Sequence, residues 1–314
     1  MRIFDFVALG HCDMDYIALI PALTPDGKTE MLEQLDQGGG PAATAAVAAA
    51  RLGASAAFIG AVGDDAPGGQ LLDGFRAERV DVSAVKIRRG ASSAIAYCLI
   101  ERDSGKRTIA WRRGGCRPLE ADELPMDMIA SAKILHLDSY DPAPAEVAAK
   151  IAVQNGVTIS LDADNPASTT PDLLAAADIL IASRAFAAEV SGGDAPEKAL
   201  KKLAGLGRAQ VVGITLGDAG AIIQSRGKTV SCPAFKVKVR DTTGAGDVFH
   251  AAFALRFNET GDAEESLRFA SGAAALKCRG LGGRTAIPSR TELEDFLQGK
   301  THCVCLTNHK NGEK

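Results

Sequence analysis

The sequence DTTGAGD at residues 241–247 leads directly into VFHAAFAL at 248–255, a stretch of good helix formers with no breaker. Gly244 and Gly246 let the backbone turn tightly and approach a ligand closely. The free N–H groups at the start of a helix attract an anion, and the helix dipole adds to this attraction. The stretch therefore predicts an anion hole at the mouth of a helix, with the Asp247 carboxylate placed to take a proton from an alcohol.

The same residues also allow a purely structural interpretation. A Gly-Ala-Gly-Asp sequence can simply close a loop, with Asp247 as the N-cap of the helix that follows. The rest of the chain decides between the two interpretations.

Composition and charge limit the classes of function. The chain has 314 residues and a mass of 32.5 kDa, with 46% hydrophobic and 24% charged residues, as is usual for a soluble globular protein. Its 35 basic and 39 acidic residues give a net charge of −4, so no global positive field attracts nucleic acid or an anionic membrane. Residues 1–10 suit a buried strand better than a signal peptide or membrane span, and the seven scattered cysteines suit reduced thiols. We therefore expect a cytoplasmic protein.

Short apolar runs alternate with alanine-rich segments along most of the chain, the pattern of βαβ units. The runs predict strands at 3–9, 55–61, 133–138, 157–161, 178–182 and 210–214. The alanine-rich segments predict helices at 41–52, 67–78, 143–155, 195–206, 247–258 and 262–279. The predicted fold class is α/β, with a doubly wound, mostly parallel sheet flanked by helices.

Two regions, about 13–37 and 94–113, depart from the βα pattern. The second alternates apolar side chains on either side of a polar turn at 101–107, which is typical of a β-hairpin. Hairpins that interrupt a doubly wound sheet can cover the crevice at the carboxyl ends of its strands, so we expect a small β-lid. We predict one domain over residues 1–298 and a polar C-terminal tail over 299–314.

A second glycine-rich stretch, QGGGPAATAAV at 37–47, opens the first predicted helix. Together with DTTGAGD, in this order and at this separation, it resembles the PfkB family of carbohydrate kinases, also called ribokinase-like. Matching segments also include RLG, GAVGDD, VGITLG and ASGAA, at 51–53, 60–65, 212–217 and 270–274. The resemblance covers residues 3–298. It implies a ribokinase-like fold and transfer of the γ-phosphoryl of ATP, with Mg²⁺, to a hydroxyl of a sugar or nucleoside.

The resemblance also assigns residues to roles. The catalytic group comprises the base Asp247 and the anion-hole amides of Gly244, Ala245 and Gly246. The residues expected to meet the sugar are Asp13, Gly39, Gly40 and Thr44. The residues expected to meet the nucleotide are Thr215, Gly217, Gly220, Ser183 and Ser271. A monovalent cation such as K⁺ is implied beside Asp241 and Thr242.

Two departures from the family pattern leave contacts open. Thr44 stands where many relatives carry asparagine, so one contact to a sugar hydroxyl is altered. Ser183 begins the segment where many relatives have an Asn-x-x-Glu that organises Mg²⁺, so the protein contacts to the metal are not assigned. Asp138 and Asp162 follow predicted strands and suit either the acceptor or turn formation. His136 and His250 are interpreted as packed, hydrogen-bonded histidines.

The acceptor is the least determined part of the function. Residues 38–53, 233–237, 268–272, 275–278 and 282–284 are similar to the sulfofructose kinase branch, and Lys28 matches a lysine that holds the sulfonate there. The asparagine and arginine expected beside it fall near Trp111 and Ser139.

The lid instead offers Arg112, Arg113 and Arg117, which suit an anionic group on the acceptor or a charged hairpin edge. Trp111 could stack on a sugar or pack in a homodimer formed through the lid.

These observations favour an ATP-dependent kinase acting on a primary hydroxyl of a ketose or an acidic sugar. The alternatives are a ribokinase- or fructokinase-type kinase of a neutral sugar, or a nucleoside kinase, which would need an aromatic clamp that the few aromatic residues of the lid scarcely provide. A non-catalytic sensor of sugar or nucleotide would have lost the base or the anion hole, and both are intact.

Overall fold

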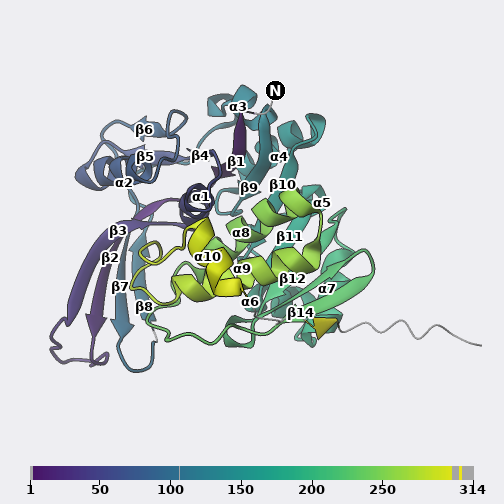
Figure 1. The fold of residues 1–314 in the computed structure, drawn as a ribbon. Helices are drawn as coiled ribbons and strands as arrows, with labels where there is room; N and C mark the ends of the chain where they lie inside the picture. The colour runs from purple at the N-terminus through teal and green to yellow at the C-terminus, as the bar shows by residue number, and fades with distance from the viewer. Residues whose placement is uncertain (1–2, 106, 299–303, 306–314) are drawn as a thin grey trace, which may run out of the picture.

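A computed structural model describes residues 3–105, 107–298 and 304–305. Its centre is a nine-stranded sheet in the order β15-β14-β13-β12-β11-β10-β9-β1-β4 (Figure 1). Six neighbouring strands are parallel: β1 (Phe4–Leu9), β4 (Ala56–Ile59), β9 (Ala132–Leu137), β10 (Thr158–Ala163), β11 (Ile179–Ser183) and β12 (Val211–Thr215). One edge is antiparallel: β13 (Ala221–Ser225), β14 (Lys228–Cys232) and β15 (Val304–Cys305).

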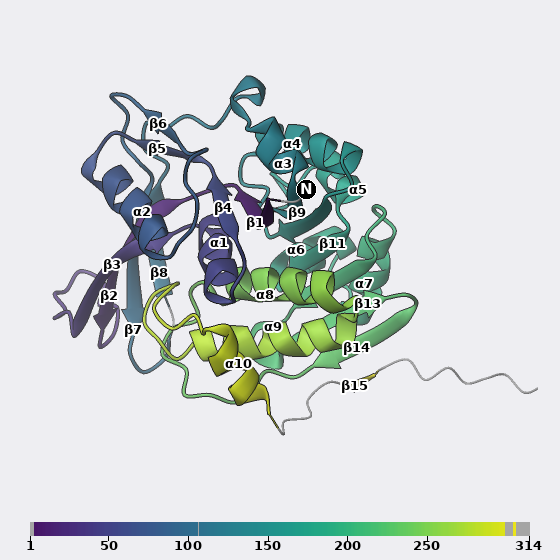
Figure 2. The same ribbon diagram turned by 45° about the horizontal axis from the view of Figure 1, so that its top comes forward.

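Helices cover both faces of this sheet because its parallel strands are apolar on both sides. Phe6 and Ala8 of β1 pack in the core under one group of helices, and Val7 and Leu9 pack under the other. The first group is α1 (Pro41–Arg51), α8 (Ala245–Thr260), α9 (Ala263–Lys277) and α10 (Arg290–Leu297). The second is α3 (Met126–Ala130), α4 (Pro142–Gln154), α5 (Pro171–Ala176), α6 (Arg184–Ser191) and α7 (Pro196–Ala204). Figure 2 shows α8, α9 and α10 together on one side of the sheet.

The two segments outside the βα pattern form a second sheet in the order β3-β2-β7-β8, which projects from the main body at the lower left of Figure 1. Its strands are β2 (Asp13–Ile20), β3 (Glu33–Gly39), β7 (Ile95–Glu101) and β8 (Arg107–Arg112). The side chains of Ile17, Cys98 and Ile100 on one face pack around Leu281. We call this sheet the lid and that side its inner face.

Each of the six predicted strands overlaps an observed one, and the predicted helices differ from the observed ones mainly at their ends. The short helices α3, α5, α6 and α10, the antiparallel edge strands and a small sheet of β5 (Ala61–Gly63) and β6 (Lys86–Arg88) beside α2 (Ala66–Ala77) were not predicted. Two short 3₁₀ helices, η1 (Ala121–Glu123) and η2 (Gly217–Ala219), complete the described elements. Of the predicted polar tail, 299–303 and 306–314 lie outside the described residues, whereas Val304 and Cys305 pair with β14. No helix in the described part of the chain is long and apolar enough to cross a membrane.

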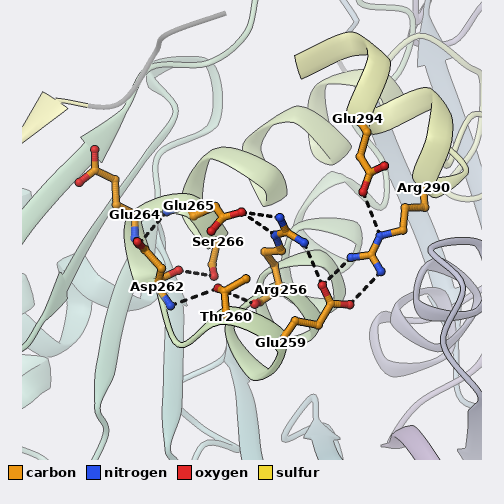
Figure 3. Close-up of polar contacts among 9 residues, drawn as sticks. All are labelled: Arg256, Glu259, Thr260, Asp262, Glu264, Glu265, Ser266, Arg290 and Glu294. Atoms are coloured by element: carbon orange, nitrogen blue, oxygen red, sulfur yellow. Dashed lines mark hydrogen bonds and ion pairs between the residues drawn. The ribbon is translucent and has the colours of Figure 1, made fainter. Parts of the chain in front are cut away.

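Helices α8, α9 and α10 meet at a charged corner (Figure 3). Gly261 ends α8 with a φ of 67°, and the Asp262 carboxylate caps α9 by accepting hydrogen bonds from the N–H groups of Glu264 and Glu265 at 2.9 and 3.0 Å. Arg256 forms ion pairs with Glu259 and Glu265 (Figure 3). This corner joins the C-terminal end of α8 to α9, whereas the N-terminal end of α8 carries DTTGAGD.

In the same corner, Arg290 at the start of α10 pairs with Glu259 of α8 at 2.5 Å and with Glu294 at 3.2 Å (Figure 3). The pair with Glu259 connects α10 to α8, and the apolar side chains of Leu293 and Leu297 on α10 pack in the core.

Candidate active site

The loop before α8 has the geometry expected of an anion hole. Gly244 caps the helix with a φ of 76°, and a Cβ atom at this position would lie 2.7 Å from the carbonyl oxygen of Gly283. Only glycine therefore fits. The first helical hydrogen bond runs from Val248 N–H to Gly244 O at 3.1 Å, which leaves the N–H groups of Gly246 and Asp247 at the open end of the helix.

Two details of this loop differ from the sequence prediction. The helix begins at Ala245, two residues earlier than expected, so Asp247 lies in its first turn. Ala245 N–H, one of the three amides assigned to the anion hole, donates to Thr242 O at 3.2 Å and is engaged within the loop. Of the three predicted amides, that of Gly246 therefore lies at the open helix end, where the N–H of Asp247 joins it.

Asp247 is the base candidate, and its surroundings favour that role. Desolvation by burial raises the pKa of its carboxyl well above the usual value, and the nearby carboxylates of Asp162 and Asp138 raise it further. Lys277 and Arg284 partly oppose this effect. A carboxylate with a raised pKa is a stronger proton acceptor near neutral pH, as proton removal from an alcohol requires.

The two strand-end aspartates near Asp247 are held by the fold. Asp162 at the end of β10 pairs with Nε2 of His250 at 3.2 Å, and this pairing lowers the pKa of Asp162 against the effect of burial. Asp138 accepts hydrogen bonds from the N–H groups of His11 and Ala42, at 2.7 and 3.2 Å, so it ties β9 to the end of β1 and the start of α1. Both act on Asp247 through their charge and their packing.

A second cluster of carboxylates lies where β2 leaves the main sheet. Oδ1 of Asp13 is buried and has no hydrogen-bond partner among the described residues. Asp13 pairs with Gly39 across β2 and β3, and a Cβ atom on Gly39 would lie 2.6 Å from Oδ1 of Asp13 and 2.3 Å from Oδ2 of Asp15. Gly39 therefore leaves room for two carboxylates that point to the same side of the lid. Gly40 follows as the N-cap of α1.

Asp15 is a site residue that the sequence analysis missed. Only 6% of it is exposed, and burial, followed by the charge of Asp13, raises its pKa to about 7. The signal was present: in Asp13-Met14-Asp15 the two acidic side chains alternate along a strand and so share one face.

Arg284 is the cation of this cluster, and it was not selected from the sequence as a site residue. Its guanidinium is buried, donates from Nη2 to Gly39 O at 2.8 Å and from Nε to the Thr44 hydroxyl at 3.4 Å, and lies 5.1 Å from the ring centre of Phe75. Thr44, predicted to meet the sugar, is itself buried and oriented toward Arg284.

The lid side chains predicted to hold the acceptor separate into two groups. Trp111 lies opposite Ala96 on the inner face. Its ring meets the ring of Tyr140 edge-on, with the ring centres 5.9 Å apart, and the Tyr140 ring stacks on that of His11 with the centres 4.0 Å apart. Arg112 is the next residue along β8 and therefore points to the opposite side of the lid. The prediction that Arg112 faces the site is wrong for this reason.

The remaining cations proposed for an acidic acceptor are engaged elsewhere. Arg113 pairs with Asp141 at 2.6 Å, and Arg117 pairs with Glu120 and Glu123 at 2.6 and 3.4 Å. Lys28 lies in the exposed loop between β2 and β3, whereas Asp13 and Gly39 pair at the opposite end of that hairpin. The fold of one chain therefore does not bring Lys28 to Asp13.

A cleft of about 490 Å³ opens on the other side of the DTTGAGD loop. Its lining includes four of the five residues predicted to meet a nucleotide, Thr215, Gly217, Gly220 and Ser271. It also includes Thr242, Ala245 and Gly246 of the DTTGAGD loop. Its apolar lining includes Phe235, Val237, Val239, Phe249, Ala274 and Ala275. The Ser271 hydroxyl is buried and has no partner among the described residues, so it is available to a ligand.

Ser183 is the exception among the predicted nucleotide contacts. Its hydroxyl caps α6 by accepting a hydrogen bond from Phe186 N–H at 3.1 Å, and it is not among the residues that line the cleft. It pairs with Thr215 across β11 and β12, so it lies beside the cleft, but its side chain serves the helix.

The sequence profile of the pfkB family carbohydrate kinases matches residues 4–290. The chain belongs to this family. The ribokinase of Haemophilus influenzae is 30% identical over 298 residues, which cover 92% of this chain and 97% of that protein. The ATP-dependent ribose-1-phosphate kinase of Halopiger xanaduensis is also 30% identical, over 301 residues that cover 93% of this chain and 97% of that kinase.

Among solved structures, the ribokinase of Arabidopsis thaliana complexed with ribose and ATP superimposes on this pfkB-family chain with a TM-score of 0.80, at 25% identity over 95% of this chain and 99% of the other. The predicted fold class is thereby confirmed as ribokinase-like. The protein is an ATP-dependent carbohydrate kinase. These relatives are of the ribokinase type, so the finer resemblance to the sulfofructose kinase branch stays a prediction.

Proposed function

We propose that this kinase transfers the γ-phosphoryl group of ATP to a primary hydroxyl of a neutral sugar, a pentose or a ketohexose. The observation that carries the proposal is the pair of carboxylates on the inner face of the lid. Asp13 presents a buried oxygen that has no partner within the described part of the chain, and Asp15 lies beside it. Carboxylate oxygens accept hydrogen bonds from sugar hydroxyls, and a buried acceptor gains most from such a bond when water is excluded.

The carboxylate pair and the base belong to one continuous site. Gly244 packs against Gly283, the next residue is Arg284, and Arg284 bonds to Gly39 beside Asp13. A sugar held at Asp13 would therefore lie next to the helix mouth that carries Asp247. Asp247 would take the proton of the attacking hydroxyl, and the open amides at the helix end would stabilise charge on the transferring group.

The cleft at Thr215, Gly217, Gly220 and Ser271 is the proposed site of ATP. Its apolar wall suits a flat, uncharged base, and its inner end meets the DTTGAGD loop, where the phosphates would bind. Mg²⁺ would accompany the phosphates and neutralise their charge. The relative named as a complex with ribose and ATP supports this arrangement.

The charges around the acceptor pocket favour a neutral sugar over an acidic one. Asp13 and Asp15 set two carboxyl groups against one cation, Arg284, at the pocket. Arg113 and Arg117 are paired with carboxylates, and Arg112 points away. An anionic substituent would need an unpaired cation, and it would be repelled by the aspartates.

The second candidate is a kinase of a phosphorylated or sulfonated sugar. One observation supports it: Arg107 lies on the inner face of the lid, near the DTTGAGD loop, where it bonds to Thr242. The similarity to a ribose-1-phosphate kinase points in the same direction.

Turnover of a panel of acceptors tests the proposal. We would measure ADP formation with Mg·ATP on ribose, fructose, other ketoses and aldoses, ribose 1-phosphate, sulfofructose and adenosine, and locate the new phosphate ester by ³¹P NMR. We expect the highest kcat/KM on a neutral sugar, with the ester on a primary carbon. Preference for the phosphorylated or sulfonated sugars would establish the second candidate, and preference for adenosine would overturn both.

The Asp247→Asn variant tests the base. It should lower kcat by about 10²- to 10⁴-fold while sugar and ATP still bind, because the amide keeps the shape and loses the proton acceptor. Wild-type turnover in the variant would overturn the assignment. A sensor without catalysis would instead show ligand binding and no turnover in the wild type.

We also propose that the protein forms a homodimer through the lid. Strand β8 is the outermost strand of the lid sheet, and its Ile109 and Trp111 are exposed by 44% and 57%. Unpaired edges and exposed apolar side chains favour association. Light scattering on wild type and on Ile109→Lys should give dimer and monomer masses respectively, and a monomeric wild type would refute the proposal.

A further inference from the structure

The last residue of α9 is a lysine that the chain buries completely. Lys277 has an exposed fraction of 0%, and its Nζ atom donates a hydrogen bond to the main-chain oxygen of Asp241 at 2.9 Å. Fully buried lysines are rare unless they are paired, because removing an ammonium group from water is costly. Lys277 bonds to Asp241, the first residue of DTTGAGD, so we ask what this buried lysine contributes to the anion-hole loop.

Asp241 uses all of its oxygen atoms to shape this loop. Oδ1 accepts hydrogen bonds from the N–H and the hydroxyl of Thr243, both at 2.8 Å, and Oδ2 accepts one from Gly282 N–H at 2.7 Å. The carbonyl oxygen accepts the bond from Lys277. Asp241 thereby joins the loop before α8 to the segment that carries Gly282 and Gly283, against which Gly244 packs.

The buried Asp241 carboxylate needs a positive charge nearby, since none of the three groups that donate to Oδ1 and Oδ2 is charged. Lys277 is the buried cation beside Asp241, and the Asp247 carboxylate also lies within its electrostatic reach. The ammonium of Lys277 thus supplies the charge between the loop-forming aspartate and the base.

The family resemblance implied a monovalent cation held by Asp241 and Thr242, and these residues do not fit that group. The main-chain oxygen of Asp241 already binds the ammonium group of Lys277, and a second cation at that oxygen would be repelled by this charge. The carboxylate oxygens of Asp241 accept bonds from Thr243 and Gly282, and the Thr242 hydroxyl accepts one from the Arg107 guanidinium at 2.9 Å. We propose that Lys277 Nζ takes the place of that cation and holds the anion-hole loop in shape, so that this kinase works without potassium. Lys277 is in this sense a positioning residue, acting through Asp241.

The first test uses the wild-type enzyme in buffers whose only monovalent cation is tetramethylammonium, with and without added K⁺. Two quantities are measured: the Kd of Mg·ATP by calorimetry, which needs no acceptor, and kcat on the sugar that the panel identifies. We expect each to change by less than about twofold when K⁺ is added. A rise in the kcat of the wild type by about tenfold or more on adding K⁺ would overturn the proposal.

The second test removes the ammonium group. Lys277→Ala leaves a space beside Asp241, and we expect kcat to fall about tenfold or more without K⁺ and to recover in part when K⁺ or NH₄⁺ is added, but not with tetramethylammonium, which is too large. Lys277→Met fills the same space with an uncharged chain, so it should lose activity and not recover. A merely structural lysine would give loss without rescue by small cations.

Lys201→Ala, at an exposed position on α7, is the control and should behave as the wild type. If Lys277→Ala does not fold, the response of wild-type kcat to K⁺ and the activity of Lys277→Met still test the proposal. Wild-type turnover of Lys277→Ala in tetramethylammonium alone would refute the role of Lys277. Since ATP binding is measured without an acceptor, a failed acceptor proposal would not be mistaken for a failure here.

Discussion

Arg107 of the lid donates a hydrogen bond from Nη1 to the hydroxyl of Thr242, at 2.9 Å, across 135 residues of sequence. Arg107 lies on the inner face of β8, opposite the buried Ile100, and Thr242 lines the cleft proposed for ATP. The bond therefore places a guanidinium group at the junction between the lid, the nucleotide cleft and the anion hole.

We predict that Arg107→Ala raises the KM for ATP and lowers kcat, with a combined loss in kcat/KM of roughly 10- to 100-fold, because a charged hydrogen bond contributes about 1.5–3 kcal/mol. Steady-state kinetics with varied ATP measures this. Arg112→Ala, one residue along β8 on the other side of the lid, is the control and should change kcat/KM little. Equal losses in the two variants would show that only lid stability matters.

Features that depend on local sequence could be predicted, and roles that depend on contacts between distant residues could not. The parallel strands, α1 and the DTTGAGD loop were predictable because each depends on local periodicity or on glycine placement. Arg284 and Lys277 could not be assigned roles in this way, because both act through contacts with residues more than 30 positions away. Arg112 was misplaced by a single step of strand alternation, which charge clustering alone does not reveal.

Lys28 was misplaced for a different reason. Its match to a lysine of a related branch was a statement about sequence, whereas its position depends on how far the β2–β3 hairpin extends from Asp13. Ser183 shows a third kind of limit: the same hydroxyl can cap a helix or bind a ligand, and only the bond to Phe186 N–H decides.

The pH dependence of turnover should follow Asp247. Because burial and neighbouring carboxylates raise its pKa, kcat/KM should fall as the pH is lowered through that raised value and the base becomes protonated. Asp162→Asn removes one of the neighbouring charges and keeps an acceptor for His250. We therefore predict that the acidic limb of the pH–rate profile moves to lower pH.

Asp164→Asn provides the control for that shift, since Asp164 is exposed and lies two residues further along the chain. Its profile should match the wild type. An unchanged acidic limb in Asp162→Asn would mean that the charge of Asp162 does not reach the base.

Ser271 should contribute to nucleotide affinity. Ser271 lines the cleft, and its buried hydroxyl has no partner among the residues that the structure describes. In Ser271→Ala, a nucleotide would therefore lose any hydrogen bond that it makes to this hydroxyl. We predict a rise in the Kd of Mg·ATP of about 2- to 10-fold, which corresponds to one neutral hydrogen bond. Ser266→Ala on the same helix is the control, because its hydroxyl bonds to Asp262 O at 2.6 Å, and it should alter stability and leave the Kd unchanged.

The corner of α8, α9 and α10 should contribute to stability without affecting catalysis. Asp262→Ala removes the cap of α9, which we expect to lower the free energy of unfolding by about 1 kcal/mol. Chemical denaturation measures the loss, and kcat should stay at the wild-type value. Asp295→Ala, which removes an acidic side chain from α10 and caps no helix, is the comparison and should cost less. A matched fall in kcat would indicate that the corner is coupled to the site.

Asp15, the carboxylate beside Asp13 that sequence reasoning did not select, should make the stability of the protein depend on pH. The fold raises the pKa of Asp15 from its usual 3.8 to about 7, through burial and the charge of Asp13. A raised pKa means that the neutral form is favoured in the folded protein, so this contribution to stability is complete below the unfolded pKa and is lost as the pH rises through about 7. Asp15→Asn should therefore be more stable than the wild type at pH 8, by on the order of 2 kcal/mol, with the difference shrinking toward pH 4.

Thermal unfolding of the ligand-free protein at several pH values measures this effect, and sugar affinity measured beside it should fall because a hydroxyl acceptor has been weakened. Asp138, whose pKa burial raises to about 6, acts with the same sign, so the variant keeps part of the pH slope. Asp36→Asn, at an exposed position of β3, is the control and should shift neither stability nor affinity. If Asp15→Asn unfolded in parallel with the wild type at every pH, Asp15 would be ionised at no cost in the fold, and its place in the acceptor pocket would rest on geometry alone.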